Sequence, residues 1–163
     1  MFHLPVSARA LKFVLVFAAA LAASACTKNA DELGQGGAAT PGSQQDFVVN
    51  VGDRVFFETD SSELTSSAQA TLSKQASWLT QYPRYSFTVE GHADERGTRE
   101  YNFALGARRS QAAHDYLVSK GIAASRMRTV SYGKERPVAT CDDISCWSQN
   151  RRAVTVLSGA PGS

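Results

Sequence analysis

The residues with the clearest chemical potential lie in the polar stretch 91–97, where His92, Asp94 and Glu95 stand almost side by side. Histidine and carboxylate side chains are metal ligands, so a metal site is one interpretation of this cluster. The chain has only three histidines, however, and no ligand pattern surrounds His92 or His114. A structural or surface role for His92 is therefore the favoured interpretation, and we expect no metal and no other cofactor.

The pattern of nucleophiles and bases does not indicate catalysis. The chain has no G-x-S-x-G motif, and no nucleophile is paired with a base and an orienting acid. An envelope hydrolase therefore finds no support in the residues, and the sequence indicates a binding protein rather than an enzyme.

Two charged residues in and after this stretch each allow more than one role. Asp94 can bind a ligand, or it can accept hydrogen bonds from the backbone N–H groups at the start of the following helix. Arg109 lies beside Arg108 on that predicted helix, and only one of the two can face inward. Periodicity does not decide which one does.

Residues 1–25 have the pattern of a secretory signal. Arg9 and Lys12 precede an uncharged run at 13–25, which has 13 residues and is too short to span a membrane comfortably. The run ends in small residues before Cys26, and this resembles the lipobox of bacterial lipoproteins, in which the cysteine is acylated. The usual leucine is replaced by Ala23, so ordinary signal-peptidase cleavage that leaves Cys26 as the first residue is the alternative.

The charge balance changes when the signal is removed. The whole chain has 17 basic and 15 acidic residues, and the two basic residues of the signal account for the excess. The remaining chain has 15 of each, so neither nucleic acid nor an anionic membrane surface is indicated as a partner. The apolar fraction of 43% is typical of a globular protein and excludes wholesale disorder.

Composition divides the rest of the chain into a tether, a domain and a short tail. Residues 26–46 consist mainly of small and polar residues such as Gly, Ala and Gln, with Leu33 the only large apolar residue, and such a segment cannot bury enough apolar surface to fold. It predicts a flexible tether that reaches about 70 Å at full extension and about 25 Å as a coil. Residues 47–158 form the predicted domain, and residues 159–163 a disordered tail.

Two cysteines, Cys141 and Cys146, lie close together in a predicted loop of the domain. In an exported protein such a pair most often forms a disulfide. A redox pair and half of a metal site are alternatives, but the C-x₄-C spacing does not match a thioredoxin-type motif and no second pair is present.

The domain alternates predicted strands and helices, which indicates an α+β or α/β fold. Strands are expected within 47–57 with a turn at Gly52, and at 85–90, 125–132 and 153–157. Apolar residues at helical spacing predict helices over 66–82 and from Thr98 to about residue 120. Residues 91–97 and 133–146 are expected to be loops. These elements would place Asp94 in the loop after a strand and Arg109 on the helix that follows.

The stretch 91–109, the segment 130–137 (V-S-Y-G-K-E-R-P) and residues 150–152 (N-R-R) together resemble the peptidoglycan-associated lipoproteins, within the wider family of outer-membrane-protein-A (OmpA)-like domains. The resemblance covers residues 54–157. It implies a β-α-β-α-β-β order, a mixed sheet with helices packed on one side, and non-covalent binding of the peptidoglycan stem peptide. It also implies docking to TolB, the periplasmic β-propeller of the Tol–Pal system, with a role in envelope integrity and cell division.

The family's ligand residues fall on named positions of this chain. Asp94 would accept hydrogen bonds from the ammonium of a diaminopimelate residue, and Arg109 would bind its carboxylate in a bidentate way. The segment 57–60 occupies the family's F-D-x-D pattern, with Glu58 in place of the first aspartate. The other positions that the resemblance assigns to the ligand are Thr59, Asp60, Arg96, Thr98, Asn102 and Leu105. Helix capping is the alternative role for Thr98, and core packing is the alternative for Leu105.

These features combine into one hypothesis. Cys26 would anchor the chain in the outer membrane with the domain facing the periplasm, and the domain would hold the cell wall. The alternative is an envelope interaction module that binds other proteins, with little or no direct wall binding. The resemblance also places the protein in the outer rather than the inner membrane, because Thr27 and not an aspartate follows the cysteine.

Overall fold

The computed structural model describes residues 39–159. The signal at 1–25, the lipidation site Cys26, most of the predicted tether and the end of the tail lie outside the described residues. No helix within 39–159 has the length and apolarity to cross a membrane. In chain order the elements are α2 (Gln44–Asp46), η1 (Phe47–Val51), β1 (Arg54–Phe56), α3 (Ser66–Gln81), β2 (Ser86–His92), α4 (Arg99–Ser119), η2 (Ala124–Arg126), β3 (Met127–Gly133), α5 (Ile144–Asn150) and β4 (Arg152–Ser158).

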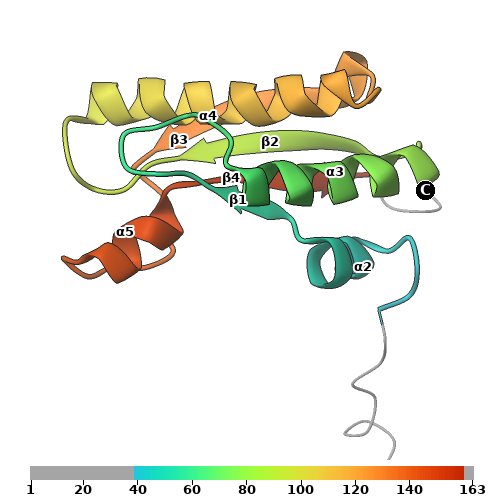
Figure 1. The fold of residues 1–163 in the computed structure, drawn as a ribbon, viewed down its shortest axis with the longest axis horizontal. Coiled ribbons are helices and arrows are strands. Elements are labelled where there is room, and N and C mark those ends of the chain that lie inside the picture. The colour runs from blue at the N-terminus through green and yellow to red at the C-terminus, as the bar shows by residue number, and fades with distance from the viewer. Residues whose placement is uncertain (1–38, 160–163) are drawn as a thin grey trace, which may run out of the picture. The chain divides into compact units, whose positions relative to one another are not determined.

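The four strands form one mixed sheet in the order β1-β4-β2-β3. Strands β2 and β3 are parallel, and β4 runs antiparallel to both of its neighbours, β1 and β2. Helices α3 and α4 run along the sheet (Figure 1). The core lies between the sheet and these helices and includes Phe87 and Val89 of β2, Leu72 and Leu79 of α3, and Leu117 of α4. The predicted α+β class and the mixed sheet are therefore confirmed.

The two long helices begin where the sequence predicts. Thr65 and Thr98 each adopt extended backbone angles, and their hydroxyl oxygens accept hydrogen bonds from the N–H groups of Ala68 and Tyr101. These are N-caps, which satisfy donors that the first turn of a helix leaves free. Because Thr98 caps α4, the first turn of α4 has a fixed position directly after the Asp94 loop.

The region 39–57 differs from the expectation of a tether followed by strands. Residues 47–51 form a π-helical turn, and only Arg54–Phe56 pair as a strand. Phe47 is fully buried and packs 4.9 Å from the ring of Trp78, so tertiary packing outweighs the β-propensity of this segment. The folded part also begins earlier than expected, because the carboxylate of Asp46 accepts a hydrogen bond from Trp78 at 2.8 Å.

A second difference is α5, which lies within and beyond the predicted loop 133–146. Its N-cap is Asp143, whose Oδ1 accepts a hydrogen bond from the N–H of Ser145 at 2.7 Å. The helix has seven residues, too few for stability on its own. It forms because other contacts, described below, hold it at the end of the sheet.

Strand β2 and helix α4 come into backbone contact at two glycines, Gly91 and Gly106. A Cβ atom at Gly91 would lie 1.8 Å from the carbonyl oxygen of Gly106. A Cβ atom at Gly106 would lie 2.4 Å from the hydroxyl of Ser131. Main chain therefore rests on main chain at this point, and no other residue type fits without moving the helix.

We expect Gly91→Ala to lower the free energy of unfolding by about 2–3 kcal/mol, because the helix backbone has to shift away from the sheet. Urea denaturation measures the loss. The matched control is Gly121→Ala, where φ is +91° but no atom lies within 4 Å of the added Cβ. The control should lower the free energy of unfolding by only about 1 kcal/mol, because alanine is strained at the positive φ of this position. An equal loss in both variants would contradict the close-approach explanation.

Candidate functional site

A pocket of about 380 Å³ opens where β2 ends, α4 begins and the loop after β1 passes. We call it the Asp94 pocket. Its lining residues are Thr59, Asp60, Asp94, Arg96, Gly97, Tyr101, Asn102 and Leu105. The structure thus brings six of the residues expected from the resemblance to one place, although the chain separates them by up to 46 positions, from Thr59 to Leu105. The remaining two, Thr98 and Arg109, do not line it.

Asp94 is 7% exposed and is held by arginines. Its Oδ2 lies 2.7 Å from Nη2 of Arg96, and its Oδ1 accepts from the Nε and the backbone N–H of the same residue, both at 3.2 Å. The Nη1 of Arg151 approaches Oδ2 to 3.5 Å. Burial raises the pKa of Asp94, but the hydrogen bonds from Arg96 and Arg151 outweigh it and hold the pKa below its ordinary value. Asp94 is therefore a carboxylate at neutral pH.

Arg109 lies behind the pocket and has no exposed surface. Its guanidinium donates to three backbone carbonyl oxygens, those of Ser61 at 2.8 Å, His92 at 2.9 Å and Glu58 at 3.1 Å. Burial, together with the nearby charge of Arg151, lowers the pKa of Arg109 to about 10, so it stays cationic at neutral pH. Arg109 joins the loop after β1 to the end of β2, which are the two walls that carry Asp60 and Asp94.

Three further predicted residues have structural partners. Thr98 accepts from the N–H of Tyr101 at 3.2 Å and acts as a helix cap. Asn102 is buried, and its Nδ2 donates to the carbonyl oxygen of Arg96 at 2.6 Å, which fixes the Asp94 loop to α4. Leu105 is 4% exposed and supplies the apolar part of the lining.

Sequence reasoning missed Tyr101, which spans the pocket. Its hydroxyl donates to Oδ1 of Asp60, from the loop after β1. Asp60 is the one non-glycine residue with positive φ, at +57°, among residues 39–159. An aspartate adopts the left-handed backbone region more readily than most residues do, but its backbone is still strained there. The contact joins positions 41 apart in the chain, so no local pattern could have indicated it.

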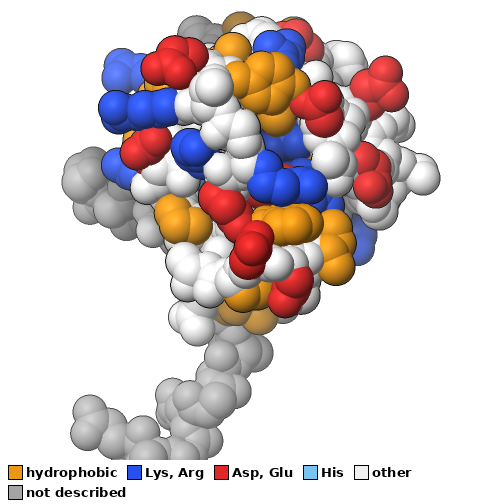
Figure 2. All heavy atoms as spheres, turned by 90° about the vertical axis from the view of Figure 1, so that its left-hand side faces the viewer, with side chains coloured by type: hydrophobic (Ala, Val, Ile, Leu, Met, Phe, Trp, Pro, Cys, Tyr) orange, Lys and Arg blue, Asp and Glu red, His pale blue; other side chains and the backbone are white. Residues whose placement is uncertain are grey.

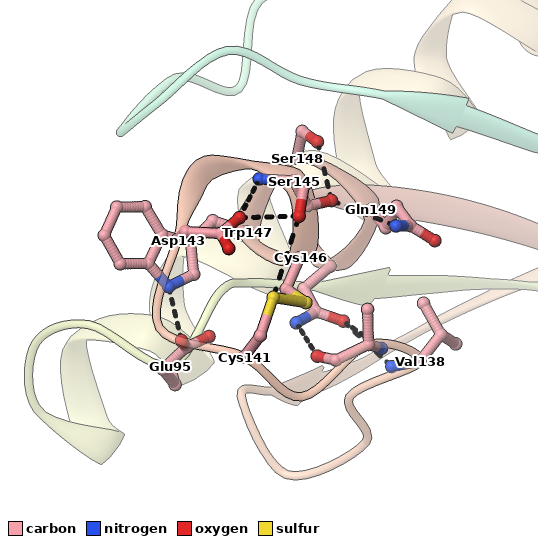
Figure 3. The surroundings of a disulfide bond; sticks show 11 residues. Glu95, Val138, Cys141, Asp143, Ser145, Cys146, Trp147, Ser148 and Gln149 are labelled. Carbon is pink, nitrogen blue, oxygen red and sulfur yellow. Dashed lines mark hydrogen bonds between the residues drawn. A yellow bond between two sulfur atoms is a disulfide. The ribbon is translucent and has the colours of Figure 1, made fainter.

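Two more residues at this end of the sheet were not predicted as site residues, Trp147 and Arg151. The Nε of Arg151 donates to the carbonyl oxygen of Phe57 at 3.0 Å, and its Nη1 faces Asp94. Trp147 lies on α5 and contacts Glu95 and Arg96. Cys141 and Cys146 are joined in a disulfide that ties the preceding loop to α5 (Figure 3).

Seen from the end that carries these loops, the surface mixes acidic, basic and apolar side chains without a dominant charge (Figure 2). Cations and anions that alternate over short distances suit a ligand that itself carries both charges. They do not suit a polyanion, which needs an extended basic surface.

His92, the last residue of β2, is buried and does not line the Asp94 pocket. Both of its ring nitrogens lack a hydrogen-bond partner, and its Nε2 lies 3.6 Å from Glu90. Burial, followed by the charges of Arg152, Arg136 and Arg54, lowers its pKa to about 4. Within 39–159 no group of three or more His, Cys, Asp or Glu side chains could hold a metal ion.

The buried neutral histidine makes the stability of the domain depend on pH. Because the pKa of His92 is about 4 in the folded state and about 6.5 when unfolded, its contribution is complete above pH 6.5. It is lost as the pH falls towards 4, by about 3 kcal/mol over that window. We expect His92→Gln to flatten this part of the stability curve, measured by urea denaturation from pH 7 to 4. Identical slopes in both proteins would contradict the assignment.

The fold and the pocket at the strand ends define an OmpA-like domain, and residues 56–151 match the model of the OmpA family. The C-terminal domain of Helicobacter pylori MotB has the same fold, with a TM-score of 0.62 at 22% identity, and covers 66% of this chain and 84% of that one.

Within that class, the chain belongs to the peptidoglycan-associated lipoproteins. It is 69% identical to the "Peptidoglycan-associated lipoprotein" of Rhizobium meliloti (strain 1021) over 151 residues, which are 90% of this chain and 86% of the relative. It is 40% identical to that of Haemophilus influenzae, over 88% of this chain and 95% of the relative. The crystal structure of the Burkholderia pseudomallei protein matches with a TM-score of 0.63 at 40% identity, and covers 65% of this chain and 90% of that one.

Proposed function

We propose that the domain binds the stem peptide of peptidoglycan non-covalently in the Asp94 pocket and links the outer membrane to the cell wall. The observation that supports this most is the convergence of Asp94, Asp60 and Arg96 on one pocket of about 380 Å³. Membership of the peptidoglycan-associated lipoproteins supplies the ligand class. Under this proposal Cys26 is the lipid anchor in the outer membrane, and the segment before the domain spans the distance to the wall.

The chemistry of diaminopimelate fits the charges around the pocket. Its side chain ends in an ammonium and a carboxylate on one carbon, so a receptor needs an anion and a cation a few ångströms apart. Asp94 and Asp60 are the carboxylates available for the ammonium. For the carboxylate, Arg96 lines the pocket, and Arg109 adds its positive charge from behind the wall without lining the pocket itself. Charge-assisted hydrogen bonds of this kind are each worth about 1.5–3 kcal/mol.

A sedimentation assay tests the proposal. The purified protein without its signal and anchor should sediment with peptidoglycan sacculi and be displaced by soluble muropeptides that contain diaminopimelate. Failure to sediment at any salt concentration would overturn the proposal. Cleavage of the wall in the same assay would indicate a hydrolase instead.

The partner TolB is proposed from family membership alone. If the propeller docks at the loops around the Asp94 pocket, wall and propeller compete for the domain. The interaction-module alternative is distinguished in the same experiment, because that protein would bind TolB and still fail to sediment with sacculi.

A further inference from the structure

The side chain of Trp147, on helix α5, contacts the loop that follows Asp94. The indole Nε1–H donates to Oε1 of Glu95 (Figure 3). The face of the same ring lies 4.1 Å from the guanidinium carbon of Arg96. Glu95 and Arg96 directly follow Asp94, so one aromatic side chain contacts both residues of the loop that presents the carboxylate.

Arg96 is held from two directions. Its Nε and Nη2 bind the carboxylate of Asp94, and its flat face rests on the indole. The side chain is 40% exposed, so burial alone does not fix it. A solvent-facing arginine loses considerable rotamer freedom when it is ordered, and a cation–π contact is what offsets part of that loss here.

The position of Trp147 is itself fixed by cross-links around α5. The disulfide joins Cys146, next to Trp147, to Cys141 in the preceding loop. Asn150 at the end of the helix accepts from the N–H of Val138 and donates to the carbonyl oxygen of Ala139, both at 2.8 Å. A helix of seven residues does not hold its own place, so these links decide where the indole lies.

We propose that Trp147 is a positioning residue for the Asp94 pocket: it orders Arg96 beside Asp94, and the disulfide that anchors α5 keeps it there. The inference rests on the proposed function for its ligand. It assigns Arg96, rather than Arg109 alone, to the ligand carboxylate, with Asp94 taking the ammonium. A ligand with both charges replaces the Asp94–Arg96 ion pair by two new ion pairs, one between its ammonium and Asp94 and one between its carboxylate and Arg96. A plain amine would break the Asp94–Arg96 pair and leave Arg96 without an anionic partner.

A double-mutant cycle on muropeptide affinity tests the coupling. Trp147→Leu should weaken binding of a soluble diaminopimelate muropeptide roughly 2- to 5-fold, the range expected for a partly exposed cation–π contact. In an Arg96→Met background the same change should have almost no effect. Ile144→Ala is the matched control, because Ile144 lies on α5 and is 60% exposed. Equal weakening by Trp147→Leu in both backgrounds would overturn the proposal.

A second readout needs no ligand. The charged groups that face Asp94 are Arg96 and Arg151, with Arg109 behind them. If Trp147→Leu releases Arg96, the titration midpoint of the Asp94 carboxyl carbon in NMR spectra should move upward, and reduction of the disulfide should move it the same way. An unchanged titration midpoint in Trp147→Leu would overturn the positioning role of Trp147. An unchanged midpoint on reduction would show that the disulfide is not needed to hold Trp147 in place. A wild type that fails to bind muropeptide would instead contradict the proposed function alone.

Discussion

Asp94→Asn is expected to weaken muropeptide binding by roughly 10- to 150-fold, the equivalent of one lost charge-assisted interaction of about 1.5–3 kcal/mol. Asparagine keeps the size of the side chain but cannot neutralise an ammonium. It also leaves Arg96 and Arg151 without the carboxylate that they share in the free domain. The site would then carry an excess of positive charge, which repels the ligand's ammonium.

Sedimentation with sacculi and titration with a soluble muropeptide both measure this effect. The matched control is Asp115→Asn, because that carboxylate lies on α4 with 64% of its side chain exposed and does not line the pocket. It should sediment like the wild type. Retention of Asp94→Asn on sacculi at wild-type affinity would show that the pocket is not the binding site.

Arg109→Met is expected to lower the free energy of unfolding by about 3–5 kcal/mol. A buried carbonyl that loses its donor costs about 1–3 kcal/mol. Arg109 donates to the carbonyl oxygen of His92 in a buried hydrogen bond and to those of Ser61 and Glu58 in partly buried ones. Partial relaxation of the loop after β1 keeps the total below a simple sum. The variant should also bind muropeptide poorly, because the wall that carries Asp60 is no longer tied to the wall that carries Asp94.

Urea denaturation followed by circular dichroism measures the stability, and Arg108→Met is the control. Arg108 is the next residue on the same helix, yet its side chain is exposed and lies 5.9 Å from the ring of Tyr101. It should cost less than about 0.5 kcal/mol, as is usual for surface changes. The loss of stability in Arg109→Lys should lie between those of Arg108→Met and Arg109→Met, because one ammonium cannot donate to all three carbonyl oxygens. A loss from Arg108→Met as large as that from Arg109→Met would contradict this account.

Much of the fold could be predicted because α3 and α4 carry their own signals. Thr65 and Thr98 cap them, the apolar spacing is regular, and Gly121 adopts positive φ directly after α4. The segment at Phe47 could not be predicted correctly, because its state depends on the aromatic rings of Trp78 and Tyr85, which lie far along the chain. Local propensity contains no information about such partners.

The candidate site shows the same division. The family resemblance assigned Asp94, Arg96 and Asn102 to the ligand, and these residues lie together because they share one loop and one helix start. Spacing could not decide whether Arg108 or Arg109 faces inward, because the two are neighbours on one helix. The choice depends on three carbonyl oxygens from other parts of the fold, to which only the side chain of Arg109 donates. Nor could spacing indicate that Trp147 meets Arg96, since that contact requires α5 to be placed first.

The contact between Gly91 and Gly106 has a consequence for how this domain tolerates sequence drift. The main chains of β2 and α4 touch there, only a few residues before Asp94 on one element and after Asn102 on the other. As long as both positions are glycine, the spacing between the two halves of the pocket is therefore set by contact between backbone atoms and not by side chains. We therefore expect volume-conserving exchanges of core residues farther along α4 to leave this separation unchanged, whereas a side chain added at either glycine should widen it.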